Sequence, residues 1–579
     1  MAAIINALDS YTPTQVGENG HVEYGWSNDT REKILQFNFQ LVRTEDDGIH
    51  KLQLTLKSIL QDLKSKISGT NIFDREVGKG LLSLLYRMIG NTRDITDGKG
   101  ECKLTYMMIC TWFDFYPELA YFAVKCLVNI GSNIHQYGSW KDIKYFCDYC
   151  KNYTRCDRHP LIHYAVYLMN EQLRSDYANY ISNSYKDISL AAKWVPREKS
   201  AFGWLYESFA TNYFENYMNT AETLSSQQKA ILKCKTDYRK LTSSLNKVID
   251  TLQIKQCNNN WSSIEFNKVT SISLSKQKKA FLNIKKNGEV RYPESKDRVS
   301  CAINFNNHIQ EGVKGNIEIK GKRVGMADFT KQAVDLLRHF SKPEMDLLNA
   351  QWKDNSTQSG ALGKMIAMVD VSGSMDGDPM NVAIALGIRI AEKSVLGQRV
   401  MTFSSVPTWV NLESCPDFIS KVALVKNADW GTNTNFHAAL ERILDVIIEN
   451  KMEPEDVQDM VLVILSDMQM DQGDACNKHT LYNLMKEKYE VAGIRVHGKP
   501  YKPPHILFWN LRSTKGFPTL SNQANSSMVS GYSPALLNTF CEQGMDALLS
   551  CTPWSVLEKV LSNDRYKIMA DKVEEHIQI

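Results

Sequence analysis

Polar residues directly after a short apolar segment have the types and spacing of metal ligands. Residues 365–369 read Met-Ile-Ala-Met-Val, and Asp370-Val-Ser372-Gly-Ser374 follows. The apolar run is typical of a buried parallel strand, so one carboxylate and two hydroxyls would lie on the turn that leaves it. Such hard oxygen ligands suit Mg²⁺ or Mn²⁺. By themselves these residues are equally compatible with a polar cap on a strand-to-helix turn.

Two later segments supply further oxygen ligands. Residues 429–436 read Asp-Trp-Gly-Thr-Asn-Thr-Asn-Phe and precede an amphipathic helix expected at 437–448. The apolar run 461–465 predicts a second buried strand, and Ser466-Asp467-Met468 follows it. Parallel α/β folds place their sites at the carboxyl edge of the sheet. We therefore expect the three segments to converge on loops above this edge, which favours a metal site over a simple cap.

This trio resembles the metal-ion-dependent adhesion site (MIDAS) of von Willebrand factor A (vWA) domains, whose pattern is D-x-S-x-S, then a Thr, then an Asp. In that family the ion accepts a carboxylate from a partner. Thr434 fits the family's G-x-x-T form better than Thr432, which stays an alternative. The resemblance implies that Mg²⁺ or Mn²⁺ is held by Asp370, Ser372, Ser374, Thr434 and Asp467.

The elements that must position these residues alternate between strand and helix, which predicts a doubly wound, Rossmann-like α/β sheet. The expected strands are 365–369, 399–403, 461–465, 505–509 and 528–530. The expected helices are 383–395, 437–449, 480–491 and 533–544, with a final amphipathic helix at 554–568. The preceding part of the chain is mostly helical in pattern, and it predicts a solenoid of stacked helix pairs.

Length and composition are those of a multidomain globular protein. The 579 residues are 43% hydrophobic and 23% charged, and no run approaches the roughly 20 apolar residues that span a bilayer. The N-terminal segment lacks the features of a signal peptide. Thirteen scattered cysteines favour reduced thiols. We therefore expect a cytoplasmic monomer that does not contact membranes.

Charge is unevenly distributed along the chain. The net charge is +3; residues 360–579 contain 20 Lys and Arg against 26 Asp and Glu, or −6, which leaves +9 for residues 1–359. Within that part, residues 226–300 contain 16 basic and 6 acidic residues, or +10. With Tyr238, Phe281 and Tyr292 interleaved, this segment is a candidate for single-stranded RNA, although a solvated basic face would have the same composition. The candidate residues are Lys233, Lys235, Arg239, Lys240, Lys276, Lys278, Lys279, Lys285 and Lys286.

Two connections between helices carry a second resemblance. The turn 93–101 reads Arg-Asp-Ile-Thr-Asp-Gly-Lys-Gly-Glu, and Gly138-Ser-Trp-Lys-Asp142 begins a later helix. These motifs resemble the TROVE module, the HEAT-like helical ring that binds RNA in the Ro autoantigen ribonucleoprotein, where a vWA domain also follows. If the helices close into a ring, its two ends must meet near the vWA domain. The charges of these motifs would then form structural pairs, for example Arg93 with Asp142 or Asp94 with Lys141.

Nearly the whole chain, about residues 30–560, is similar to an uncharacterised TROVE-like plus vWA family of plants, fungi and large DNA viruses. The segments that carry this similarity include 191–196, 261–266, 370–380, 430–436, 466–472 and 508–512. We therefore expect a multidomain α + α/β protein. Its parts are an N-terminal arm (1–30), a TROVE-like helical-repeat region (31–350), a linker (351–363) and a vWA domain (364–579).

The motifs favour a binding protein over an enzyme. The sequence contains no G-x-x-x-x-G-K-[ST] loop, H-E-x-x-H helix or G-x-S-x-G elbow. Cys147, Cys150, Cys156 and His159 could be read as zinc ligands, but the first two fall on an expected helix, and buried thiols explain them more simply. The sequence thus predicts RNA binding by the helical region and an acidic partner at the metal site. The alternative is a protein-interaction or structural scaffold, cellular or viral, with no RNA role.

Overall fold

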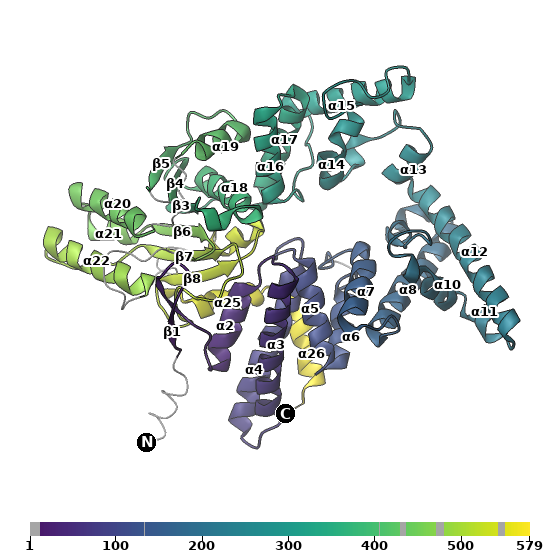
Figure 1. Cartoon of the computed structure of the whole chain (residues 1–579), viewed down its shortest axis with the longest axis horizontal. Coiled ribbons are helices and arrows are strands. Elements are labelled where there is room, and N and C mark those ends of the chain that lie inside the picture. Colours follow the sequence, from purple (N-terminus) through teal and green to yellow (C-terminus); the bar gives the residue numbers. More distant parts are fainter. Residues whose placement is uncertain are drawn as a thin grey trace.

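The computed structural model describes residues 12–131, 134–403, 406–428, 436–469, 480–541 and 550–578. These residues form a long helical region followed by a sheet domain (Figure 1). The multidomain α + α/β organisation expected from the sequence is therefore confirmed at this level. Among the described residues no helix combines the length and apolarity needed to cross a membrane.

The helical region contains sixteen α-helices among its described residues. Its first helices are α2 (Thr30–Gln40), α3 (Asp46–Ile67), α4 (Ile72–Arg93), α5 (Cys102–Phe113), α6 (Pro117–Cys126), α7 (Trp140–Thr154) and α8 (Pro160–Ile181). They are followed by α9 (Ala191–Trp194), α10 (Tyr206–Tyr213), α11 (Glu215–Asn219), α12 (Leu224–Ile249), α13 (Leu252–Cys257), α14 (Ser271–Phe281), α15 (Lys296–Val313), α16 (Met326–Arg338) and α17 (Lys342–Asn355). Helix α3 buries an apolar face that runs from Leu52 to Leu63.

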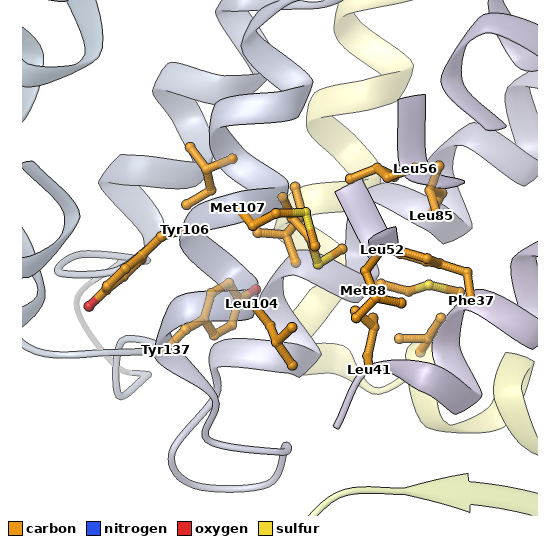
Figure 2. Close-up of a cluster of buried hydrophobic side chains, with 14 of the residues drawn as sticks. Phe37, Leu41, Leu52, Leu56, Leu85, Met88, Leu104, Tyr106, Met107 and Tyr137 are labelled. Atoms are coloured by element: carbon orange, nitrogen blue, oxygen red, sulfur yellow. The ribbon is translucent and has the colours of Figure 1, made fainter. Parts of the chain in front are cut away.

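The first helices share one apolar core. Figure 2 shows Phe37 of α2, Leu52 and Leu56 of α3, and Leu85 and Met88 of α4 packed against one another. Burying each such side chain contributes about 1.5–3 kcal/mol. The C-terminal helix α26 (Lys567–His576) packs on α4 and α6 and adds Met569 and Val573 to this core (Figure 1). The end of the predicted vWA segment is thus part of the helical core.

The sheet domain has six strands in the order β5-β4-β3-β6-β7-β8. Their bounds are β3 (Met365–Asp370), β4 (Arg399–Phe403), β5 (Thr408–Asn411), β6 (Val461–Ser466), β7 (His505–Asn510) and β8 (Ser526–Ser530). Neighbouring strands are parallel except β5, which pairs antiparallel with β4. The helices are α18 (Asp378–Lys393), α19 (Phe418–Lys426), α20 (Phe436–Glu449), α21 (Pro454–Gln458), α22 (Leu481–His497), α23 (Asn538–Cys541) and α25 (Pro553–Leu561). Strand β5 and helix α19 were not expected from the sequence.

Both faces of the sheet are covered. Successive side chains of a strand point to opposite faces; Ala367 and Val369 of β3 share a core with α18, whereas Met368 between them shares one with α20. This burial explains why β3 and β6 read as continuous apolar runs. If β3 is counted as strand 1 of the domain, the strands lie in the sheet as 3-2-1-4-5-6, which is the doubly wound order. The strand order reverses direction between β3 and β6. A doubly wound sheet was the sequence expectation.

The helical region contacts the sheet domain at both of its ends. Helix α2 lies against β8 (Figure 1), where the Ser530 hydroxyl donates to the Asn38 carbonyl at 2.8 Å. At the other end α16 and α17 pack on α18 and α19, and Trp352 stacks on Phe418 with ring centroids 3.9 Å apart. Helix α17 continues through Asn355, so the predicted 351–363 linker begins inside a helix. From α2, which contacts the sheet domain, the helices run away from that domain as far as α12. Helices α14–α17 then bring the chain back to it (Figure 1).

Within the expected N-terminal arm (1–30), the structure describes residues 12–30. Residues 14–24 form a small antiparallel hairpin, β1 (Thr14–Val16) with β2 (Val22–Tyr24). Tyr24 pairs with Phe517 of the sheet domain. The Asn19 side chain donates to the Gln469 carbonyl at 3.0 Å, directly after β6. The hairpin is therefore docked on the sheet domain beside the candidate site.

The turn 93–101 joins the two parts of the molecule. Arg93 donates to both carboxylate oxygens of Asp142 at 2.7 and 2.8 Å, which confirms the first predicted pair. Asp94 forms an ion pair with Arg565, which lies between α25 and α26, at 2.7 Å. The suggested pair of Asp94 with Lys141 was therefore wrong. Lys99 donates to Ser530 of β8 at 2.7 Å. The motif that carried the resemblance is thus a structural junction.

Candidate functional site

The candidate ligands lie where the strand order of the sheet reverses. Asp370 is the last residue of β3, and Ser466 is the last residue of the adjacent parallel strand β6. Doubly wound folds bind ligands in the crevice outside the carboxyl ends of the strands at this switch point. The topology therefore brings the predicted segments 370–374 and 466–467 together.

Asp370 is fully buried and held by two serines. Its Oδ1 accepts a hydrogen bond from the Ser372 amide at 3.0 Å, and its Oδ2 accepts one from the Ser466 hydroxyl at 2.5 Å. Burial, together with the negative charge of Asp467, raises the pKa of the Asp370 carboxyl to about 7. A neighbouring positive charge would therefore favour the ionised form of this carboxyl.

Asp467 is the second buried carboxyl, 1% exposed. Its Oδ1 accepts a hydrogen bond from the Gln469 amide at 3.0 Å, and no described group completes one to its buried Oδ2. Burial raises the pKa of Asp467, an effect that the Gln469 amide partly offsets. The next residue, Met468, has φ of 63°, in the left-handed region that few residues other than glycine adopt. Strained backbone of this kind is concentrated at functional sites.

The two serines of the predicted set lie beside these carboxyls. Ser372 is buried, Ser374 is half-buried, and their hydroxyl oxygens are 3.1 Å apart. The Arg512 guanidinium donates to the Ser374 carbonyl. We expected ligands on loops above the sheet, but Asp370, Ser372 and Asp467 are buried. The structure therefore brings four of the five predicted ligands together.

The fifth predicted ligand, Thr434, and its alternative Thr432 fall outside the described residues. Among residues that are described, no cluster of three or more His, Cys, Asp or Glu side chains is arranged to hold a metal. The candidate site consists instead of two carboxyls and serine hydroxyls, a donor set suited to a hard cation. Asp467 Oδ2 is buried and accepts no hydrogen bond from the described residues. A cation bound there would compensate its negative charge.

A cavity of about 360 Å³ adjoins the candidate site. Ser374, Asp467 and Arg512 line it from the sheet domain, while Lys51 of α3 and Glu18 of the hairpin line it from the N-terminal part. Among the described residues, the cations Lys51, Arg512 and Lys515 and the carboxyls Glu18 and Asp467 line this cavity. The site thus opens toward a space of mixed charge between the sheet domain and the helical region.

Sequence reasoning missed three contributors to the site. Ser466 bonds Asp370, Gln469 fixes Asp467 through its amide, and Arg512 fixes the Ser374 carbonyl. Ser466 directly precedes Asp467 at the end of an apolar strand, so its position was a usable signal. Arg512 comes from the segment after β7, and nothing in the local sequence connects it with Ser374.

The predicted RNA-binding residues do not form one surface. Four of the nine lie on α12, three lie on α14 and two follow α14 directly. Helix α13 lies between α12 and α14 (Figure 1). Tyr238 and Phe281, expected to be available for stacking, are fully buried core residues, and the Tyr238 hydroxyl donates to Asn170 at 2.9 Å. Four of the cations form ion pairs with carboxylates: Lys235 with Glu207, Lys240 with Asp237, Lys278 with Glu344 and Lys285 with Glu289.

The cysteines considered as zinc ligands lie around α7. Cys147 and Cys150 are buried on that helix, and Cys156 is exposed beyond its end. The Cys150 sulfur lies 3.4 Å from Nδ1 of His159. Burial raises the pKa of the Cys147 thiol well above its ordinary value. A neutral thiol packed in a core is the simpler description of Cys147.

Comparison with known proteins finds two domains of unknown function. Residues 145–358 match the family model DUF2828, and residues 364–572 match DUF7788. An uncharacterised protein of Acanthamoeba polyphaga mimivirus is 28% identical over 473 residues, which cover 79% of this chain and 76% of the viral protein. Two parts of the chain are therefore similar to domains of unknown function, and most of the chain is similar to an uncharacterised protein of a large DNA virus.

Proposed function

We propose that this is a metal-dependent binding protein whose sheet domain is a vWA domain with a MIDAS-type site. The observation that carries the proposal is the pair of buried carboxyls, Asp370 and Asp467, at the strand ends where the sheet reverses direction. Two adjacent buried carboxyls are costly unless a cation compensates them. The strand order, with one antiparallel edge strand, also supports a doubly wound domain of this kind.

The residues present fit Mg²⁺ or Mn²⁺. Asp370, Ser372, Ser374 and Asp467 would hold the ion, with Thr434 as the ligand expected from the resemblance. Bound there, the ion would supply positive charge and a coordination position for a carboxylate of a partner. Arg512 and Lys515, in the cavity next to the site, would favour the approach of that acidic group. We assign no catalytic reaction to the site.

The second part of the proposal is RNA binding by the helical region. Its support is the +9 charge of residues 1–359 and the resemblance to TROVE proteins. A protein-interaction scaffold with no RNA role is the second candidate. The ion pairs that neutralise Lys235, Lys240 and Lys278 favour it, because such lysines have less charge to offer to phosphates. Salt-dependent binding of RNA by the purified protein separates the two.

Metal binding is tested by calorimetric titration of the full chain with MnCl₂ and MgCl₂. We expect the wild type to bind one divalent ion, and Asp370→Ala and Ser372→Ala to lose detectable binding. The matched control is Asp376→Ala, because Asp376 is an exposed carboxylate only two residues beyond Ser374; it should bind like the wild type. Thermal unfolding checks that each variant folds. Equal affinity of the wild type and both site variants would refute the metal assignment.

A further inference from the structure

The face of α7 that lies against residues 193–204 carries cations resting on aromatic rings. Lys141, Lys144 and Lys151 are spaced along one side of the helix, as residues three or four apart are. Trp194, Phe202 and Trp204 lie beside them, and α7 packs on α9. We call these residues, with Lys193 and Tyr145, the lysine–aromatic stripe.

The cations of the stripe sit close to ring faces. Lys144 Nζ lies 4.9 Å from the ring centroid of Trp194 and 5.4 Å from that of Phe202. Lys151 Nζ lies 4.2 Å from the centroid of Trp204, and Lys193 Nζ lies 5.5 Å from that of Trp194. Lys141 Nζ lies 5.0 Å from the centroid of Tyr145, which is 40% exposed. Side chains of both kinds are therefore held in place at the surface.

Among the residues that the structure describes, no carboxylate forms an ion pair with these lysines. Across the described part of the chain, none of Lys141, Lys144, Lys151 and Lys193 has an acidic oxygen within 4.0 Å. This distinguishes them from the ion-paired lysines of α12 and α14. Asp148 is the one acidic residue on the same side of α7 among the residues described. Burial, with repulsion from Lys141, lowers the pKa of Lys144, so an anion here would find partly desolvated cations.

A cavity of about 720 Å³ lies next to the stripe, and Lys141 and Tyr145 line both. Tyr149 and Tyr153 line it with stacked rings, 6.2 Å apart and 15° from parallel. Tyr106 also lines it; its hydroxyl points away from the apolar cluster in Figure 2 and donates to Asp142 at 2.6 Å. The volume is within the range of small-ligand sites, roughly 300–1,000 Å³. Asn152 and His50 supply polar groups on its wall.

We propose that the lysine–aromatic stripe and the adjoining cavity form the site where this chain binds single-stranded RNA, with phosphates on the lysines and a base in the tyrosine-lined cavity. Proteins bind single-stranded nucleic acids with cations along the phosphate backbone and with exposed aromatic rings on which the bases stack. The inference rests on the RNA part of the proposed function and moves the contact surface from residues 226–300 to α7 and residues 193–204.

The test uses the full chain and a fluorescein-labelled oligouridylate of about 12 nucleotides, a length within the site sizes of single-strand binders. Anisotropy over about 50 to 300 mM salt gives affinity and salt slope. Replacing Lys141, Lys144 and Lys193 together by Gln keeps much of each side chain's packing but removes the charge. We expect the slope to flatten by about 2 units, since each phosphate contact contributes about 0.7 for a single strand.

Matched variants separate charge from stacking. Replacing Lys235, Lys240 and Lys285 by Gln, an equal loss of charge on α12 and after α14, should leave the slope unchanged. Tyr145→Ala should weaken binding about tenfold at fixed salt without changing the slope, since stacking contributes about one such factor per base, and Tyr145→Phe should bind like the wild type. An oligodeoxythymidylate and an RNA duplex show whether the site distinguishes RNA from DNA and single strands from paired ones.

The outcomes distinguish this inference from the proposed function. If the wild type binds no oligonucleotide at low salt, RNA binding itself fails and the inference fails with it. If the wild type binds and only the α12 variant flattens the slope, RNA binding stands and the stripe is overturned as its site. If the stripe variant melts at lower temperature but keeps the full slope, the cation–ring contacts are only structural, which also overturns the inference. Tighter binding of the duplex than of the single strand would do so as well.

Discussion

Arg93→Met is expected to lower the free energy of unfolding by about 3–5 kcal/mol, because it leaves a buried carboxylate without its counter-charge. The Arg93 and Asp142 side chains are 7% and 2% exposed. Asp142 also accepts hydrogen bonds from the Tyr106 hydroxyl and the Ser139 amide. The Arg93 charge and its hydrogen bonds lower the pKa of Asp142 although burial acts to raise it. Urea unfolding at neutral pH measures the loss.

The control for Arg93 is an exposed ion pair between the neighbouring helices α5 and α3. Lys103 and Asp46 are 3.0 Å apart with exposed side chains, so Lys103→Met should cost less than about 1 kcal/mol. Replacing both Arg93 and Asp142 by apolar residues should recover much of the stability that the single change loses, because no unpaired charge remains. A loss below about 1 kcal/mol for Arg93→Met would contradict the structural role of this pair.

Much of the sheet domain could be predicted because its strands are buried on both faces. Runs such as 365–369 and 461–465 are apolar throughout, and the structure places strands at Met365–Asp370 and Val461–Ser466. Strand β5 escaped prediction because it is a short edge strand whose exposed Trp409 and polar neighbours give no apolar run. The doubly wound order also made the meeting of segments 370–374 and 466–467 predictable.

The environment of the site could not be predicted from local sequence. The environment of Asp370 depends on Ser466 from another strand and on α18, which packs against β3. The cavity next to the site is lined partly by Lys51 of α3, more than three hundred residues earlier in the chain. Spacing within a motif shows which oxygens share a turn, but it does not show what covers them.

For a related reason, charge counting along the chain does not show which of the predicted cations are available to a ligand. The total of +10 for residues 226–300 is correct, yet the partner of Lys278 is Glu344, from outside that segment, and Lys235 pairs with Glu207. Conversely, the lysines of α7 are few, and the rings beside them come from residues about fifty positions later. Ion pairs between distant segments decide which cations are available to a ligand.

Lys99 provides the second prediction with a large effect, a rise in stability with pH. It is fully buried where the helical region meets the sheet domain, and its ammonium donates to the Asn38 carbonyl at 2.8 Å and to Ser530 Oγ at 2.7 Å. Burial lowers the pKa of Lys99 to about 7, against the opposing charge of Glu101. In the unfolded chain the pKa is about 10.4. Between these values the unfolded state binds more protons, so stability rises with pH by up to about 1.4 kcal/mol per unit.

We would measure the free energy of unfolding of the wild type and of Lys99→Met and take the difference between them. The range is about pH 7 to 9, in which the free energy of unfolding depends on pH through Lys99. Subtraction cancels the other titrating groups, so we expect the wild type to gain up to about 3 kcal/mol over the variant in this range. Below about pH 7 the two curves should run parallel, because Lys99 is protonated in both states. Lys103→Met, an exposed lysine four residues away, should parallel the wild type throughout. Parallel curves for Lys99→Met above pH 7 would instead mean that its hydrogen bonds keep the buried ammonium charged, and that the junction is held by a permanent positive charge.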